Sequence, residues 1–145
     1  MRITGPWDHQ RIERFLSESL VPLRLGMRDG RGWPLVVSLW FVHAEGSLWC
    51  ATPRSARIVT HLRHEPRCAF EVAPDTPPYR GVRGRARAEI RPADGGRILE
   101  ALLSRYGQAD TRLGAWLRGR VAAEVALQLE PLGFHSWDFS RRMGS

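Results

Sequence analysis

The sequence predicts an α+β protein in which short antiparallel strands are flanked by helices. The segment GVRGRARAEIR, residues 81–91, alternates arginine or glutamate with small or apolar residues, which is the period of a β-strand. Other segments repeat apolar residues every three or four positions, as amphipathic helices do. The 145 residues contain no internal repeat, low-complexity tract or linker, so we expect one domain over residues 1–145.

The first half of the chain is predicted to begin with a helix and to continue as a meander of strands. Asp8 is a good N-cap for a helix that extends to Leu20. Three extended segments follow, separated by an Asp-Gly and a Glu-Gly turn: residues 23–30, 33–43 and 47–52. Residues 35–43 are apolar on both faces, which a barrel wall covered by a neighbouring subunit would explain.

The second half is predicted to alternate helices and strands. The expected elements are a helix over 55–65, strands over 68–72 and 81–91, helices over 97–106 and 111–120, and a closing strand pair over 121–129 and 134–139. In the strand 81–91, the small residues Gly84, Ala86 and Ala88 should face the interior or a partner subunit. Arg83, Arg85 and Arg87 then form a solvated strand face.

The charge of the chain favours anionic ligands. All 22 basic residues are arginine, and the formal net charge is +7. Guanidinium groups bind phosphate and carboxylate through paired hydrogen bonds, although nucleotide bias in the genome also explains the absence of lysine. A nucleic-acid-binding module that uses the Arg83, Arg85 and Arg87 face is an alternative, but we expect no nucleic-acid partner.

The composition also indicates a cytoplasmic protein without a membrane segment. The first ten residues lack the apolar region of a signal peptide, and no apolar run approaches the roughly 18 residues of a membrane helix. Cys50 and Cys68 have no metal-type spacing, so we expect no disulfide framework. His61 and His64 lack a third ligand, and we expect no metal site.

The segment ATPRSARIVTHLRHEPR, residues 51–67, has the features of an anion site. If Ser55 caps the helix, Arg54 and Arg57 lie at its positive end, where acidic residues are normally favoured. Two arginines, a hydroxyl and free backbone N–H groups at one helix start suit a phosphate. The alternative is that both arginines simply extend into water.

A hairpin closed by the Glu-Gly dipeptide would bring a second element to this site. Its register sets Trp40 opposite Ala51 and Leu39 opposite Thr52. A flat aromatic group attached to the phosphate could then lie along these strands. This layout suggests flavin mononucleotide (FMN).

The residues that carry these features resemble the pyridoxamine 5'-phosphate oxidase-like family of FMN-binding split barrels. The resemblance rests on VVSLWFVHAEGSLWCAT, on TPRSAR followed by HLRHEPRCAFEV, on PPYRGVRGRARAEI, and on the closing SWDFSRR. It covers the chain from about Leu23 to Phe139. It implies a homodimer of six-stranded antiparallel split β-barrels with Greek-key topology and flanking helices, and two flavins at the interface.

The resemblance also implies which residues bind the cofactor. The phosphate would be held near Arg54, Ser55 and Arg57. The ring and ribityl chain would be lined by residues of the two hairpin strands, namely Val37, Ser38, Leu39, Trp40, Ala51 and Thr52. Tyr79 and Trp137 look like contacts from the second subunit. The implied activity is that of an oxidoreductase that transfers hydride through the flavin to or from a small substrate, and no catalytic acid or base is identified.

The resemblance leaves other activities open. True pyridoxamine phosphate oxidases carry a C-terminal Arg-x-His-x-Arg type element, which WDFSRRMGS does not match, so that activity is set aside. The family also includes deazaflavin-dependent reductases and haem-binding proteins. A deazaflavin coenzyme is therefore an alternative cofactor, haem is a weaker one, and a non-catalytic carrier of flavin or haem remains an alternative function.

Overall fold

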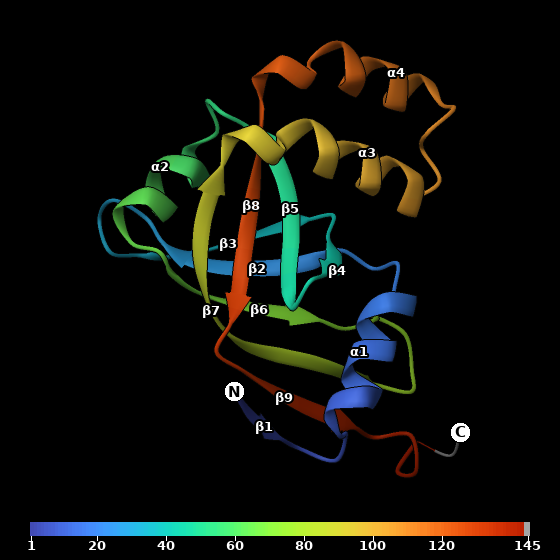
Figure 1. The fold of residues 1–145 in the computed structure, drawn as a ribbon. Helices are drawn as coiled ribbons and strands as arrows, with labels where there is room; N and C mark the ends of the chain where they lie inside the picture. Colours follow the sequence, from blue (N-terminus) through green and yellow to red (C-terminus); the bar gives the residue numbers. More distant parts are fainter. Residues whose placement is uncertain (144–145) are drawn as a thin grey trace.

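A computed structural model describes residues 1–143, and residues 144–145 of the predicted domain lie outside the described residues. Its strands are β1 (Arg2–Thr4), β2 (Leu23–Arg28), β3 (Pro34–Leu39), β4 (Val42–Ala44), β5 (Ser47–Pro53), β6 (Arg67–Val72), β7 (Arg80–Arg91), β8 (Glu124–Pro131) and β9 (Gly133–Asp138). Its helices are α1 (His9–Glu18), α2 (Arg57–His64), α3 (Gly95–Arg105) and α4 (Arg112–Gly119), with short 3-10 helices η1 (Pro92–Asp94) and η2 (Val121–Ala123). Figure 1 shows their arrangement.

All of these strands belong to one sheet that curls into a half-barrel. Seven of them follow the order β3-β2-β6-β7-β8-β5-β4, and every neighbouring pair is antiparallel. β9 pairs with β7, and β1 lies parallel to β9. In Figure 1, β5 and β8 run across the direction of β2 and β3. The predicted α+β antiparallel class is confirmed, whereas the predicted number of six strands is wrong, because residues 1–143 form nine.

The strand predicted over residues 81–91 is the longest of the sheet and joins its two halves. The first part of β7 pairs with β9, where Arg80 lies opposite Asp138, and the last part pairs with β8, where Arg91 lies opposite Ala126. The predicted pairing of the two closing strands with each other is therefore wrong. Only Leu132 separates β8 from β9, too little for a hairpin, and its N–H donates to the Arg85 carbonyl at 2.8 Å.

The two faces of β7 are divided as the alternation predicts. Ala86 is only 1% exposed and contributes to the main core, whereas Arg83, Arg85 and Arg87 are exposed. This core also receives the apolar faces of α1 and α2 and an edge-to-face contact between Phe70 and Phe134. The side chains that period two placed inside are therefore the ones that fill the half-barrel.

The helices begin close to their predicted positions. Asp8 caps α1 by accepting a hydrogen bond from the Arg11 N–H at 2.8 Å, as predicted. The helix ends at Glu18, however, and Leu20 is 60% exposed instead of lying on the apolar face. No helix in the described part of the chain is long and apolar enough to cross a membrane.

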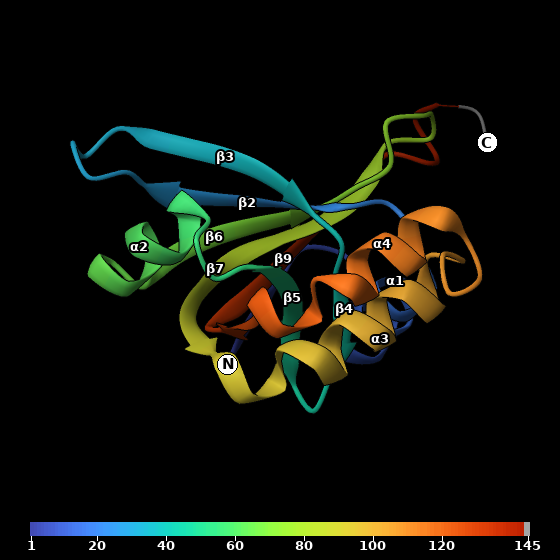
Figure 2. The ribbon, with the colours of Figure 1, turned by 90° about the horizontal axis from the view of Figure 1, so that it is seen from above.

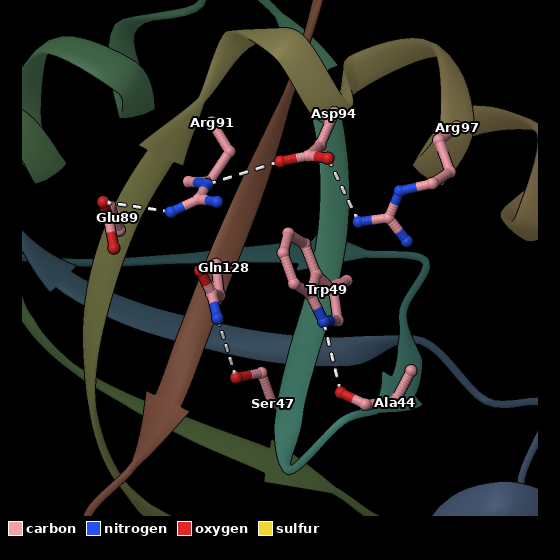
Figure 3. Close-up of polar contacts among 8 residues, drawn as sticks. All are labelled: Ala44, Ser47, Trp49, Glu89, Arg91, Asp94, Arg97 and Gln128. Carbon is pink, nitrogen blue, oxygen red and sulfur yellow. Dashed lines mark hydrogen bonds and ion pairs between the residues drawn. The ribbon is translucent and has the colours of Figure 1, made fainter.

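A second apolar cluster attaches α3 to the outer side of the sheet. Ile98 and Leu102 of α3 pack with Trp49 of β5 and Ala126 of β8. Polar contacts fix the start of the helix (Figure 3): Asp94 accepts hydrogen bonds from Arg97 and Arg91 at 3.1 and 3.3 Å. The bond from Arg97, followed by that from Arg91, lowers the pKa of Asp94. α3 is thus held firmly beside β5.

Candidate cofactor cleft

The predicted hairpin strand over residues 33–43 is interrupted, and the interruption opens the sheet. β3 ends at Leu39 and β4 begins at Val42, with Trp40 and Phe41 between them. The hairpin turn itself is confirmed: Glu45 and Gly46 have φ of 55° and 77°, and Val42 lies opposite Trp49. Positive φ at both turn residues is typical of a type I′ turn.

The predicted register beyond this hairpin is wrong. Trp40 does not pair with Ala51, nor Leu39 with Thr52, because β3 turns away from β5 and pairs with β2 instead. Leu39 lies opposite Leu23 in that pairing. β3 and β5 therefore separate just beyond the hairpin.

The separation contains a cleft of about 420 Å³. Five residues predicted to line the flavin ring and ribityl chain are part of its lining: Ser38, Leu39, Trp40, Ala51 and Thr52. They come together through the divergence of β3 and β5 and not through strand pairing. The volume lies within the range of about 300–1,000 Å³ that is usual for ligand sites.

The rest of the cleft comes mainly from segments that the sequence did not connect to it. α3 and α4 lie side by side in Figures 1 and 2, and Arg118 of α4 donates a hydrogen bond to Glu100 of α3 at 2.7 Å. The further lining residues are Pro53, Leu99, Leu102, Leu113, Trp116, Leu117, Arg120 and Glu124. The apolar faces of both helices were predicted, but the same pattern is expected of helices that pack on a core.

Val37 does not line the cleft. Its side chain packs on the main core with Leu35 and Leu39, because alternate residues of β3 face inward. The opposite face of β3 is uncovered, and Val36 is 67% exposed.

The predicted phosphate segment follows the cleft directly in the chain. Arg54, Ser55 and Arg57 are exposed and come after Pro53, which lines the cleft, but they are not part of its lining. The Arg54 N–H and guanidinium donate to the carbonyls of Ala123 and Ala122 at 2.7 and 3.1 Å. These bonds fix the segment against the chain that enters β8.

The predicted cap of α2 is wrong, although the helix start keeps its positive character. The N-cap is Ala56, not Ser55, because the Ala56 N–H closes a turn onto the Pro53 carbonyl and delays the helix. No side chain of residues 1–143 caps this helix, and its first turn has no acidic residue. Its free N–H groups and Arg57 are thus available to an anion.

Tyr79 and Trp137 lie far from the cleft of the same chain. The Phe139 N–H donates to the Tyr79 carbonyl at 2.9 Å, and Trp137 pairs with Gly81, so both aromatic residues belong to the β7–β9 end of the sheet. In Figure 1, this end lies opposite α3 and α4. Their role as contacts from a second subunit stays a prediction.

A larger hollow of about 620 Å³ lies at the β1–β9 side and contains none of the predicted site residues. It is an open groove between exposed side chains of Arg2, Arg83 and Arg85. We place the site in the smaller cleft, because a buried carboxyl and several apolar side chains converge there.

Glu124 is the residue of the cleft that has the most unusual surroundings. It is 6% exposed, and its Oε2 atom is buried without a hydrogen-bond partner among the described residues. Burial raises the pKa of this carboxyl, and the charge of Arg120 partly opposes the effect. The one weak signal for it in the sequence is a glutamate at the start of the apolar segment EVALQL.

Comparisons with known proteins support the fold. No family model matches the chain, and no curated protein matches it. Among solved structures, a conserved hypothetical protein of Mycobacterium tuberculosis has a TM-score of 0.79 and 23% identity over 97% of this chain and 89% of its own. An F420 reductase has a TM-score of 0.72 and 23% identity over 89% of this chain and 97% of its own.

A candidate pyridoxamine 5'-phosphate oxidase of Listeria innocua has a TM-score of 0.67 and 15% identity over 88% of this chain and 95% of its own. These likenesses show that the chain shares the fold of these proteins, which agrees with the fold that the resemblance of the sequence motifs implies.

Proposed function

We propose that the chain is an FMN-binding flavoprotein that acts as an oxidoreductase on a small substrate. The observation that carries this proposal is the cleft, since five residues that the family resemblance assigns to a flavin line one cavity of about 420 Å³. An F420 reductase and a candidate pyridoxamine 5'-phosphate oxidase share the fold, which supports a flavin-type ligand. Both cysteines are buried and unpaired, which fits a reducing cytoplasm.

The residues of the cleft fit such a cofactor. The apolar side chains of Leu99, Leu117 and Trp40 suit a flat ring. Trp40 is held in place because its ring stacks on that of Tyr106, with 5.1 Å between the ring centroids. The uncapped start of α2, with Arg54, Ser55 and Arg57 beside it, suits the phosphate. A bound flavin supplies hydride chemistry, while these residues hold the phosphate, orient the ring and exclude water.

We further propose that the active form is a homodimer in which Tyr79 and Trp137 of the second copy complete the cofactor site. Val36 on the uncovered face of β3 and Trp33 in the turn before β3 are exposed, and Trp116 is 56% exposed at the cleft. A covered interface would remove these apolar side chains from water. We expect a dimer that buries more than about 2,000 Å² in total. Light scattering at micromolar concentration tests it, and a monomer would contradict the dimer.

The experiment that tests the function is an absorption spectrum of the purified protein, followed by titration with FMN, a deazaflavin coenzyme and haem. We expect FMN to bind with a shift of the flavin bands and quenched flavin fluorescence. A folded protein that binds none of the three would contradict the proposal. Preferred binding of haem would favour a carrier over an oxidoreductase.

A deazaflavin-dependent reductase is the second candidate, and one observation favours it. The F420 reductase resembles the chain more closely than the candidate pyridoxamine 5'-phosphate oxidase does, with 23% against 15% identity. The deazaflavin coenzyme has a polyanionic tail, and Arg120 is a cation in the cleft lining. Tighter binding of the deazaflavin than of FMN would decide for this candidate.

A further inference from the structure

Glu124 is a buried carboxyl for which the described chain provides no hydrogen-bond partner at Oε2. Glu124 is part of the cleft lining, together with Thr52 and Pro53. An unpaired polar atom in such a position is destabilising, and most buried polar atoms in proteins have a partner. A ligand in the cleft can supply the missing partner.

The backbone holds Glu124 in this position. It pairs with Pro53 in the β5–β8 ladder, and the neighbouring Ala123 carbonyl accepts a hydrogen bond from the Arg54 N–H. Gly95 of α3 lies so close that a Cβ atom there would come within 2.3 Å of the Glu124 carbonyl oxygen. The backbone at Glu124 is therefore confined between β5 and the start of α3.

Among the described residues that line the cleft, Glu124 is the acidic one, and the charged groups near it are basic or already paired. Arg120, which follows α4, acts on it through its charge, and Arg54 from the segment after β5 is bonded to backbone carbonyls. Asp94, at the start of α3, is occupied by Arg91 and Arg97. Burial raises the pKa of this carboxyl and so favours its neutral form, which has an O–H donor that a ligand in the cleft can accept.

We propose that Glu124 is a cofactor-binding residue whose protonated carboxyl donates a hydrogen bond to an oxygen of the phosphate or ribityl segment of FMN. Pro53, its strand partner, both lines the cleft and directly precedes the Arg54–Arg57 segment, so Glu124 lies where the ring wall meets the phosphate end. If the acceptor is a phosphate oxygen, the neutral form is required, because a carboxylate would repel it. The inference rests on the proposed function.

The test is a fluorescence titration with FMN and with riboflavin of the wild-type protein, Glu124→Gln and Glu124→Leu, at fixed ionic strength and at pH values from about 5 to about 9. Glu124→Gln keeps a donor that does not titrate, and Glu124→Leu removes the donor. We expect wild-type FMN affinity to fall relative to Glu124→Gln as pH rises. Glu124→Leu should bind FMN about tenfold or more weakly than wild type at low pH.

The ratio of wild-type to Glu124→Gln affinity removes the titration of the ligand itself, because the phosphate, with a second pKa of about 6, is common to both proteins. An equal pH effect on riboflavin would identify a ribityl hydroxyl as the acceptor, and an effect on FMN alone would identify the phosphate. A constant ratio with unchanged affinity in Glu124→Leu would overturn the inference while leaving FMN binding intact. A folded wild-type protein that binds neither flavin would overturn the proposed function and this inference together.

Unfolding and carboxyl titration separate binding from a purely structural role. The pKa of Glu124 is higher in the folded than in the unfolded protein. The free energy of unfolding of the wild-type protein therefore falls as pH rises from the unfolded pKa to the folded pKa. Above this pH range, Glu124→Gln should be more stable than wild type. If Glu124 had only a structural role, its substitution would change the free energy of unfolding, but the ratio of wild-type to Glu124→Gln affinity for FMN would not depend on pH. In wild-type protein labelled with ¹³C at the glutamate carboxyls, FMN should raise the pKa of one buried carboxyl further, and no change would overturn the inference.

Discussion

Arg105 should contribute more to stability than any surface arginine, because it caps a helix that belongs to another part of the chain. Its guanidinium donates to the carbonyls of Leu16 and Ser17 of α1 at 2.7 and 2.9 Å, and to that of Ser19. α1 has no basic residue in its own last turn, so Arg105 supplies the cation that the helix C-terminus favours. Its guanidinium also lies 4.9 Å from the ring centre of Phe41.

We expect Arg105→Ala to destabilise the protein by about 2 to 4 kcal/mol. One charge-assisted hydrogen bond contributes roughly 1.5 to 3 kcal/mol, but the three bonds are not additive, and water can replace part of them at this partly exposed site. At roughly 3 °C per kcal/mol for a domain of this size, Tm should fall by about 6 to 12 °C. Urea unfolding, followed by tryptophan fluorescence, measures the change.

Arg97→Ala is the matched control, because Arg97 lies on the same helix and also contacts an aromatic ring. Its hydrogen bond to Asp94 is at the surface, and its side chain is 54% exposed, so the loss should stay below about 1 kcal/mol. Arg105→Lys keeps the charge without the guanidinium fork and should be intermediate. Equal losses for Arg105→Ala and Arg97→Ala would refute the assignment of Arg105 as the cap of α1.

Three further predictions test the sheet, the cleft wall and the phosphate segment. Ala86→Leu should destabilise by roughly 1 to 3 kcal/mol through overpacking of a core position, and Arg85→Gln by less than about 0.5 kcal/mol, in urea unfolding; the opposite order would mean that the faces of β7 are reversed. Gly114→Ala should destabilise the protein by about 1 to 3 kcal/mol, because its Cβ would lie 1.9 Å from the Gln108 carbonyl oxygen. Gly119→Ala is the control and should be neutral or stabilising, because no atom of the described residues lies within 4 Å of its Cβ. Equal shifts of Tm in the two variants would argue against the close approach at Gly114. Arg57→Ala should weaken FMN binding about ten- to hundredfold and leave riboflavin binding almost unchanged, whereas Arg85→Ala should affect neither strongly; equal losses in fluorescence titrations of the two variants would indicate only a general electrostatic effect.

Much of the fold could be predicted because its signals are local. The alternation in residues 81–91 predicted the faces of β7, and Asp8 predicted the start of α1. Local patterns also predicted that β8 and β9 exist, but not that both pair with β7. These pairings connect distant parts of the chain, and at their junction the Leu132 N–H donates to the carbonyl of Arg85, 47 positions earlier.

The site could be predicted only where a hairpin or a family motif connects its residues. Ser38 to Trp40 were placed near Ala51 and Thr52 by the hairpin, although they meet across a cleft and not in a ladder. Trp116 and Leu117 could not be assigned to the cleft, because their helical spacing does not say which surface α4 covers. Glu124 looks like an ordinary strand residue until its burial is known.

The opening of the sheet leaves a backbone N–H group that needs a hydrogen-bond partner, and the residue that follows α3 supplies it. Where β3 separates from β5, the Phe41 N–H has no strand partner, and Tyr106 fills that role: its hydroxyl accepts from Phe41 at 3.3 Å and donates to the Val21 carbonyl at 3.3 Å. The ring of Tyr106 stacks on Trp40, which lines the cleft, while Phe41 is fully buried in the core. Trp40 and Phe41 therefore point to different sides of the break, and one tyrosine stabilises both the break and one side of the cleft. Tyr106 directly follows Arg105. The hydrogen bonds from Arg105 that attach α3 to α1 therefore also position Tyr106 beside the break between β3 and β4.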